Sequence, residues 1–251
     1  MKLLRADLAC ATDLHQLPGD VDAVVHNAAT FPWTDVSQSE VAACNVVGSA
    51  YLVQWTSDHS SVARFIHYST VSVYGNVAES VLDEDRSPVP TEIYGSSKLA
   101  AEHLVRDELA HLNPTQIRFP VVLGAGAHRA FLPRVADALL RDEDVTIRNP
   151  DAPYNAMTTL RAVADFTERL LAQPAKPGRI VNLGADDPMS VRGIIELLKT
   201  RTASRSRIVV DPEPTSCYRV DFAGAIGLGY RAPSVKDALE YYCAESGWRG
   251  R

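Results

Sequence analysis

The stretch Arg64–Gly75, RFIHYSTVSVYG, is a run of apolar and β-branched residues that ends at a glycine, which is typical of a buried strand. After it, Tyr94–Leu112 carries apolar residues at helical spacing, and Thr115–Gly124, TQIRFPVVLG, indicates another strand. Such alternation predicts βαβ units, with helices on both faces of a parallel sheet. The predicted fold class is therefore α/β, with a doubly wound sheet.

The alternation continues toward both ends of the chain. Val21–Ala29 predicts a strand, and Ser39–Trp55 predicts a helix that follows a capping serine. Further helices are expected near 131–141, 160–171 and 190–200, with a strand at 178–184 and a glycine-rich turn before a C-terminal helix.

Composition narrows the class of protein. The 251 residues are 46% hydrophobic, which is enough for a sizeable core, and the net charge of −6 argues against binding to nucleic acid or an anionic membrane. The four cysteines are far apart and form no Cys-x-x-Cys, so we expect no metal site and a reducing, cytoplasmic location. Because Arg5 and Asp7 interrupt the first apolar residues, we expect no export signal and no membrane span.

Tyr94 and Lys98 lie four residues apart on the predicted helix, so they share one face and can act on one atom. A cation within roughly 4–6 Å lowers the pKa of a phenol by about 1–3 units, which would make Tyr94 a usable acid and base. Taken alone, the pair has another interpretation, in which Tyr94 begins a helix and Lys98 is solvated. The surrounding motifs favour the catalytic interpretation.

Five stretches occur in an order and spacing that resemble one family. They are VVHNAA at 24–29, NVVGSAYLV at 45–53, FIHYSTVSVYG at 65–75, YGSSKLAAEHL at 94–104 and IRFPVVLGAG at 117–126. The set resembles the extended short-chain dehydrogenases/reductases, the NAD-dependent epimerase/dehydratase group. The likeness continues through 178–198 and 221–239, so it covers nearly the whole chain.

The resemblance implies a catalytic set. Tyr94 would be the general acid and base, and Lys98 would lower its pKa and hold the nicotinamide ribose. Thr70 would donate a hydrogen bond to the reacting oxygen, with Val71 beside the substrate. A structural role for Thr70 at the end of a strand is the alternative.

The resemblance also implies binding residues. The cofactor would be NAD or NADP, and Arg219 stands near the position of an arginine that grips a diphosphate, although an exposed arginine needs no such role. The expected cofactor contacts, in addition to Tyr94 and Lys98, are Asp7, Leu8, Ala28, Ala29 and Asn45.

Some positions depart from the family pattern. Val71 and Ser72 stand where sugar-nucleotide dehydratases carry Asp-Glu, so we do not expect a 4,6-dehydratase. Val121 replaces a common asparagine, and 159–162 replaces a usual His-Val-Asp-Asp.

The N-terminal part of the sequence differs most from the family pattern. The family's glycine-rich turn, which binds pyrophosphate at a helix N-terminus, is not found, and Met1–Leu8 already resembles the third strand. A piece on the order of 50 residues would be missing. We therefore expect Leu3–Leu8 either to move beside Ala23–His26 or to leave a groove, and NAD(P) to bind weakly.

These observations predict a Rossmann-like sheet, truncated at its N-terminus, with a smaller C-terminal α/β region. Residues 1–125, joined by 158–183, would form the partial dinucleotide-binding domain, and 126–251 mainly the substrate-binding region. The expected activity is an NAD(P)-dependent epimerase or oxidoreductase that acts by hydride transfer on a small molecule such as a nucleotide sugar. The alternative is a cofactor-independent or non-catalytic binding or regulatory protein.

The resemblance also implies a homodimer. It would form through the helices near 39–55 and 94–112, with Val47, Leu104 and Leu112 as candidate contacts. Burial of these three side chains within the subunit is the alternative.

Overall fold

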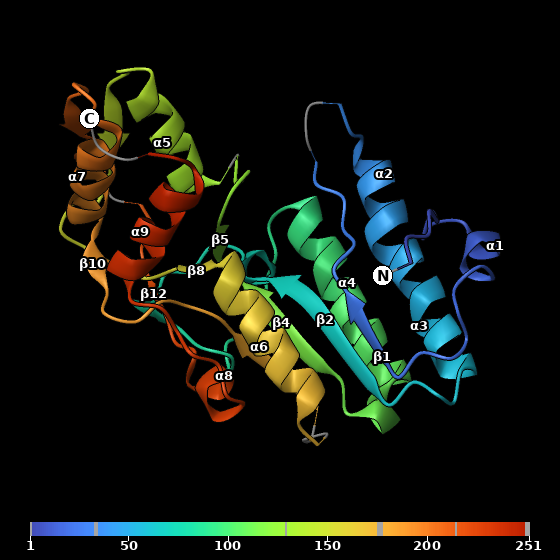
Figure 1. Ribbon diagram of the computed structural model, residues 1–251. Coiled ribbons are helices and arrows are strands. Elements are labelled where there is room, and N and C mark those ends of the chain that lie inside the picture. The colour runs from blue at the N-terminus through green and yellow to red at the C-terminus, as the bar shows by residue number, and fades with distance from the viewer. Residues whose placement is uncertain (1, 33–34, 129, 175–177, 214, 249–251) are drawn as a thin grey trace. The chain divides into compact units, whose positions relative to one another are not determined.

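The computed structural model describes residues 2–32, 35–128, 130–174, 178–213 and 215–248. The chain forms two compact units (Figure 1). The first contains residues 1–76, 86–118 and 170–181, and the second contains residues 77–85, 119–169 and 182–251. Each unit is therefore assembled from several separate segments of the sequence.

The first unit is built on a four-stranded sheet. Its strands are β1 (Ala23–His26), β2 (Arg64–Thr70), β4 (Thr115–Phe119) and β9 (Arg179–Asn182), in the order β1-β2-β4-β9. β1 runs parallel to β2, with Val24 opposite Phe65. This arrangement confirms the predicted α/β fold with a parallel sheet.

Helices α2 (Gln38–Ala42) and α3 (Gly48–Asp58) follow one another end to end and lie beside α4 (Ile93–Glu108), which packs against β2 (Figure 1). α2 begins at a capping box, in which Ser37 and Glu40 each accept a hydrogen bond from the other's backbone N–H. A π-helical turn (Ala43–Val47) joins α2 to α3, so the single helix predicted over 39–55 is interrupted. The core under these helices contains Leu14, Leu52, Val53, Trp55, Val62, Phe65, Val105 and Leu109.

The predicted strand at the start of the chain is wrong. Residues 2–6 have no regular structure, and the Leu3 side chain is 88% exposed. Asp7 instead leads into the short helix α1 (Ala11–Leu14). Among the described residues β1 pairs with β2 alone, so Leu3–Leu8 do not move beside Ala23–His26. A strand is stable only when its backbone groups find a partner, and residues 2–6 find none within the part of the chain described.

Among its described residues, the second unit contains four two-stranded sheets. β5 (Val121–Leu123) pairs with β8 (Met157–Thr159), β6 (Val145–Ile147) with β11 (Ile208–Val210), β7 (Pro153–Tyr154) with β10 (Met189–Ser190), and β3 (Val81–Leu82) with β12 (Arg219–Val220). Its helices are α5 (Phe131–Leu140), α6 (Leu160–Ala172, of which residues 160–169 belong to this unit), α7 (Val191–Thr202), α8 (Ala223–Gly227) and α9 (Val235–Glu245).

The core of the second unit lies between α5, α7 and α9. These helices contribute buried aliphatic side chains, including Leu132, Leu139, Ile194, Leu198 and Leu239. The predicted helices near 131–141, 160–171 and 190–200 are all confirmed.

The strand predicted over 115–124 is split in two by Pro120. Proline has no backbone N–H to donate to a ladder, so it disrupts pairing within a strand. β4 ends at Phe119 and belongs to the first sheet, whereas β5 begins at Val121 and pairs with β8.

Candidate active site

Tyr94 lies in the first turn of α4, and a close backbone contact fixes that turn. A Cβ atom on Gly95 would overlap the carbonyl oxygen of Ser72, so only glycine lets α4 approach the turn that follows β2. The hydroxyl of Ser97 donates to the carbonyl of Tyr94 at 2.8 Å. The start of α4 is thereby held against the segment that carries Thr70.

The ring of Tyr94 is covered by Phe31. The two rings stack with their centroids 4.3 Å apart and their planes 23° from parallel. Burial raises the pKa of Tyr94 to about 12. The expectation that Lys98 lowers this pKa is therefore not met in this structure, because loss of water around the phenol decides the direction.

Lys98 is directed to another partner. Its side chain is buried, and Nζ lies 3.1 Å from Nε2 of His67. Burial lowers the pKa of Lys98 to about 8, opposed by the negative charge of Glu102 and by Cys44. Sequence spacing correctly placed Lys98 one turn after Tyr94, but it could not identify His67 as its contact.

Thr70 ends β2 and begins a 3₁₀ turn (Val71–Tyr74). Its hydroxyl accepts a hydrogen bond from the backbone N–H of Ser72 at 3.1 Å and lies 3.2 Å from the hydroxyl of Ser72. Val71, the other predicted substrate contact, is half-buried at the start of the turn. Since Gly95 packs on Ser72, the structure brings Thr70 and Tyr94 to neighbouring segments.

Asn45 lies in the π-helical turn and joins two segments. Its Oδ1 accepts from the Thr30 N–H at 2.7 Å, and its Nδ2 donates to the Thr30 carbonyl at 2.9 Å and to the Ser97 hydroxyl at 3.0 Å. It thus ties the loop after β1, which contains Ala28 and Ala29, to α4. π-helical turns are frequent at functional sites.

Asp7 and Leu8, two of the predicted cofactor contacts, interact in this structure with neighbouring residues of the chain. The Asp7 carboxylate accepts from the Ala9 N–H at 2.9 Å, and the Asp7 N–H donates to Asp13 at 2.9 Å. Leu8 packs against Gly48, where an added Cβ would lie 3.1 Å from the Leu8 side chain. Both residues are held by the turn that leads into α1.

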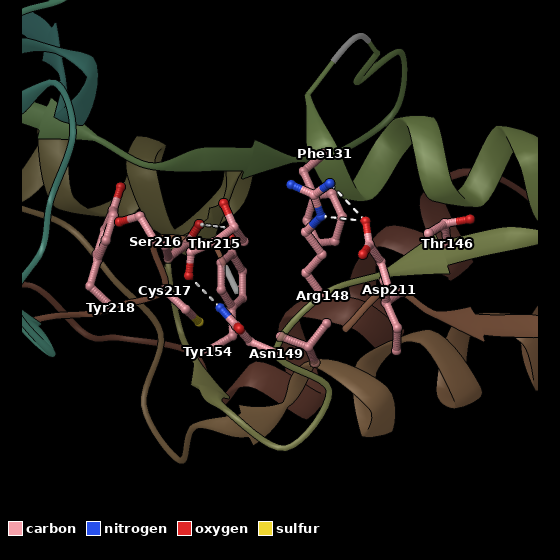
Figure 2. A pocket seen from close by; sticks show the side chains of 13 residues that line it. Phe131, Thr146, Arg148, Asn149, Tyr154, Asp211, Thr215, Ser216, Cys217 and Tyr218 are labelled. Atoms are coloured by element: carbon pink, nitrogen blue, oxygen red, sulfur yellow. Dashed lines mark hydrogen bonds and ion pairs between the residues drawn. The ribbon is translucent and has the colours of Figure 1, made fainter. Parts of the chain in front are cut away.

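The second unit has a pocket of about 440 Å³ that sequence analysis did not identify. Figure 2 shows Arg148 paired with Asp211 on one side, and Tyr154, Cys217 and Tyr218 on the other. Arg148 Nη2 lies 2.7 Å from the Asp211 carboxylate. Asn149 donates to the backbone carbonyl of Thr215. No motif indicates this pocket, because pairing of β6 with β11 brings its two halves together.

Arg219, the predicted diphosphate ligand, does not line this pocket. It is exposed and lines a separate hollow of about 350 Å³, together with Asp186 and Asp221. In the part of the chain that the structure describes, no three His, Cys, Asp or Glu side chains are grouped so that they could hold a metal ion. None of the described helices is both long and apolar enough to cross a membrane.

Comparison with known proteins agrees with this architecture. The sequence profile of the NAD dependent epimerase/dehydratase family matches residues 1–184. The dTDP-D-glucose 4,6-dehydratase of Bos taurus is 30% identical over 88% of this chain and 68% of its own length. The UDP-glucose 4-epimerase of Streptomyces lividans is 29% identical over 72% of this chain and 60% of its own length.

A solved structure shows the same fold. The UDP-glucuronic acid 4-epimerase of Bacillus cereus in complex with NAD superposes with a TM-score of 0.78 at 24% identity, over 93% of this chain and 78% of that chain. The fold, the profile and the sequence identity agree: the chain belongs to the NAD dependent epimerase/dehydratase family, within the extended short-chain dehydrogenases/reductases.

Proposed function

We propose that this chain is an NAD(P)-dependent epimerase or oxidoreductase that transfers hydride at a hydroxyl- or carbonyl-bearing carbon of a nucleotide sugar. The observation that supports it is the packing of Gly95 on Ser72, which brings Tyr94 and Thr70 to adjacent segments. Relatives are named for activity on dTDP- and UDP-sugars, and a solved neighbour holds NAD.

The residues of the first unit suit the nicotinamide end of such a cofactor. Ala28 and Ala29 present small side chains after β1, and Asn45 holds the loop that follows them. A bound nicotinamide would supply the hydride chemistry. The glycine-rich turn whose backbone amides bind pyrophosphate in this family is not found in this sequence. We therefore expect this chain to bind NAD and NADP more weakly than about 1 µM.

Tyr94 would exchange the proton of the reacting hydroxyl. With a pKa of about 12 it is a neutral phenol at physiological pH, which suits it to donate that proton to a carbonyl oxygen. The Thr70 hydroxyl would donate a second hydrogen bond to the same oxygen. Lys98, one turn further along α4, would hold the nicotinamide ribose.

We propose epimerisation or oxidation–reduction rather than dehydration. Elimination of water needs a general acid and a base beside the sugar, and the residues that follow Thr70 are Val71 and Ser72. The likeness to 4,6-dehydratases therefore does not extend to their reaction.

We propose that the pocket of the second unit, considered by itself, can bind a nucleotide. Tyr154 and Phe131 supply aromatic surface, and their ring centroids lie 6.2 Å apart. Arg148 and Asn149 supply polar groups for a base or a phosphate. Arg219 lines a different hollow, so we propose it as a diphosphate ligand only if the diphosphate binds in that hollow.

We also propose a cytoplasmic homodimer. All four cysteines are unpaired, which suits a reducing compartment. Val47 is 41% and Tyr51 38% exposed on the α2–α3 segment, whereas Leu104 and Leu112 are half-buried. A monomeric mass by light scattering at micromolar concentration would contradict the dimer.

The activity test incubates the chain with NAD or NADP and separate UDP- and dTDP-sugars, and follows the sugar by NMR. Tyr94→Phe should reduce turnover by about 10²–10⁴-fold without changing the free energy of unfolding. Tyr51→Phe, on the exposed side of α3, is the matched control. Equal turnover in Tyr94→Phe and the unaltered chain would refute the role of Tyr94, and product from none of the sugars would favour a non-catalytic binding protein. Calorimetric titration with NAD and NADP measures the expected weak affinity.

A further inference from the structure

A buried chain of hydrogen bonds runs from Lys98 on α4 through β2 to β4. Nζ of Lys98 lies 3.1 Å from Nε2 of His67, and Nδ1 of His67 lies 3.0 Å from Oε1 of Gln116. Nε2 of Gln116 donates to the backbone carbonyl of Glu102 at 3.1 Å. Lys98, His67 and Gln116 are 2%, 0% and 2% exposed, so water cannot replace these contacts.

The groups at the two ends of this hydrogen-bonded series determine which atom donates and which accepts in each of its hydrogen bonds. A backbone carbonyl only accepts, so the Glu102 carbonyl requires the amide nitrogen of Gln116, which turns Oε1 of Gln116 toward His67. Because Oε1 only accepts, Nδ1 of His67 must carry the proton. At the other end an ammonium only donates, so Nε2 of His67 must present its lone pair to Lys98. Both ends demand the same tautomer.

His26 lies on the other side of His67, and its tautomer is also determined. The two rings stack with centroids 5.3 Å apart and planes 18° from parallel. The Ser49 hydroxyl donates to the Asn45 carbonyl at 2.6 Å, so it accepts from Nε2 of His26 at 2.8 Å. His26 is therefore protonated at Nε2, and its buried Nδ1 has no partner among the described residues.

We infer that His67 is a positioning residue for Lys98: a neutral, Nδ1-protonated imidazole whose orientation Gln116 imposes and whose Nε2 lone pair holds the lysine ammonium in place. Neither histidine can gain a proton without disrupting this arrangement, since a second positive charge would lie beside the ammonium. That this contact between His67 and Lys98 matters for turnover rests on the proposed function. The tautomers of the histidines and the protonation of Lys98 are independent of that function.

The charges around Lys98 agree with this assignment. Glu102, one turn later on α4, and Cys44, in the π-helical turn, both favour the ammonium, whereas burial opposes it. His67 and His26 face Lys98 from β2 and β1, and their pKa values are lowered by burial and by the charge of Lys98. Both rings therefore stay neutral at physiological pH, and the ammonium is the cation of this cluster.

The first test is the tautomer of each histidine in the unaltered chain. The sequence contains seven histidines, and long-range ¹H–¹⁵N correlation spectra distinguish Nδ1–H, Nε2–H and imidazolium forms. We expect His67 in the Nδ1–H form and His26 in the Nε2–H form, with neither titrating between about pH 5.5 and about pH 9. An Nε2–H or a doubly protonated His67 would overturn the inference.

The second test follows Lys98 itself. The sequence has five lysines, Lys2, Lys98, Lys176, Lys199 and Lys236, so the Cε signal of Lys98 can be followed against pH in ¹³C-lysine-labelled protein. In His67→Phe the ammonium loses its acceptor, and the titration midpoint of Lys98 should fall by about one pH unit. His67→Gln, which retains an acceptor, should restore most of the shift. An unchanged midpoint in a folded His67→Phe variant would show that His67 does not hold Lys98.

The two proposals can fail separately. If the tautomers and the Lys98 midpoint are as expected but no sugar is converted, the positioning network stands and the proposed activity fails. If sugar is converted and depends on Tyr94, but His67 is Nε2-protonated, the activity stands and the positioning role fails. His103→Phe, at an exposed position on α4, is the matched control for replacement of a histidine.

Discussion

Glu102 and Arg118 form a bidentate ion pair that is closed to water. Arg118 Nε lies 2.9 Å from one carboxylate oxygen of Glu102, and Nη2 lies 2.6 Å from the other. The two side chains are 1% and 4% exposed, respectively. Ser69 donates a further hydrogen bond to Glu102 at 2.5 Å, and the Arg118 guanidinium lies 4.6 Å from the centre of the Tyr74 ring. The pair fixes α4 to β4, one turn after Lys98.

Replacement of Glu102 by Gln should destabilise the fold strongly. The variant leaves the Arg118 charge buried without its counter-ion, and the free energy of unfolding should fall by about 3–5 kcal/mol. Asp107→Asn is the matched control, because Asp107 pairs with Arg106 at 2.7 Å on the surface, where both side chains are more than half exposed. For Asp107→Asn, urea unfolding should show a change in the free energy of unfolding of about 0–1 kcal/mol. Similar decreases in the free energy of unfolding for the two variants would contradict the expectation that breaking the buried ion pair costs more than breaking the exposed one.

His26 should make the stability of the chain depend on pH. Burial lowers its pKa from 6.5 to about 3, so between these values the unfolded chain binds a proton that the folded chain does not. Stability therefore falls as the pH falls through this range. When the pH is lowered from about 7.5 to about 5, the free energy of unfolding of His26→Leu should fall by about 2 kcal/mol less than that of the unaltered chain.

Urea unfolding at these two pH values tests the prediction for His26. His103→Leu, which replaces an exposed histidine, serves as the control. Equal pH dependence in His26→Leu and the unaltered chain would show that His26 is not held neutral in the folded state.

Asn45→Ala should loosen the loop after β1. The change removes the acceptor of the Thr30 N–H and the donor to the Thr30 carbonyl, both of which are formed by one buried amide. We expect the free energy of unfolding to fall by about 1–3 kcal/mol, and the Thr30 amide to exchange with solvent about tenfold faster or more. Gln54→Ala is the control, since that amide bonds Asp58 on the surface. Unchanged exchange at Thr30 would argue against this role of Asn45.

Two glycines in helices should respond in opposite directions to replacement by alanine. At Gly95 the new methyl group would overlap the Ser72 carbonyl oxygen, so the free energy of unfolding should fall by about 1–3 kcal/mol. At Gly227 a Cβ would meet no atom within 4 Å, and stability should rise by about 0.5–1 kcal/mol through helix propensity. Thermal unfolding of the two variants decides the point, and a stabilised Gly95→Ala would exclude a close contact with Ser72.

The sequence predicted what depends on local pattern. The strand predicted over 64–75 is found over 64–70, where a 3₁₀ turn replaces its last residues; the helix that begins near Tyr94 and the parallel sheet are confirmed, because buried strands and amphipathic helices differ in the period of their apolar residues. The helix predicted through Leu112 ends at Glu108 and continues as a 3₁₀ turn over Ala110–Leu112. Element boundaries depend on competing caps that periodicity does not resolve.

What the sequence could not predict depends on contacts between distant residues. Spacing placed Lys98 on the face of Tyr94, but the direction of a long flexible side chain depends on burial and on His67, which is 31 residues away. The pocket of the second unit combines residues near 131–156 with residues 211–218, which meet only after β6 and β11 pair. The strand expected near Leu3 depended on partners that the described residues do not provide.

The path of the chain between the units has a consequence for any attempt to separate them. The backbone passes from one unit to the other after Asn76, Asp85, Arg118, Arg169 and Val181, and Pro120 lies just beyond the third of these passages. A single proteolytic cut therefore releases neither unit whole, and a gene fragment with one pair of ends cannot encode either. Exchange of one unit between family members would need several simultaneous junctions, because recombination at any one of them leaves at least one unit with a core that mixes residues of both parents.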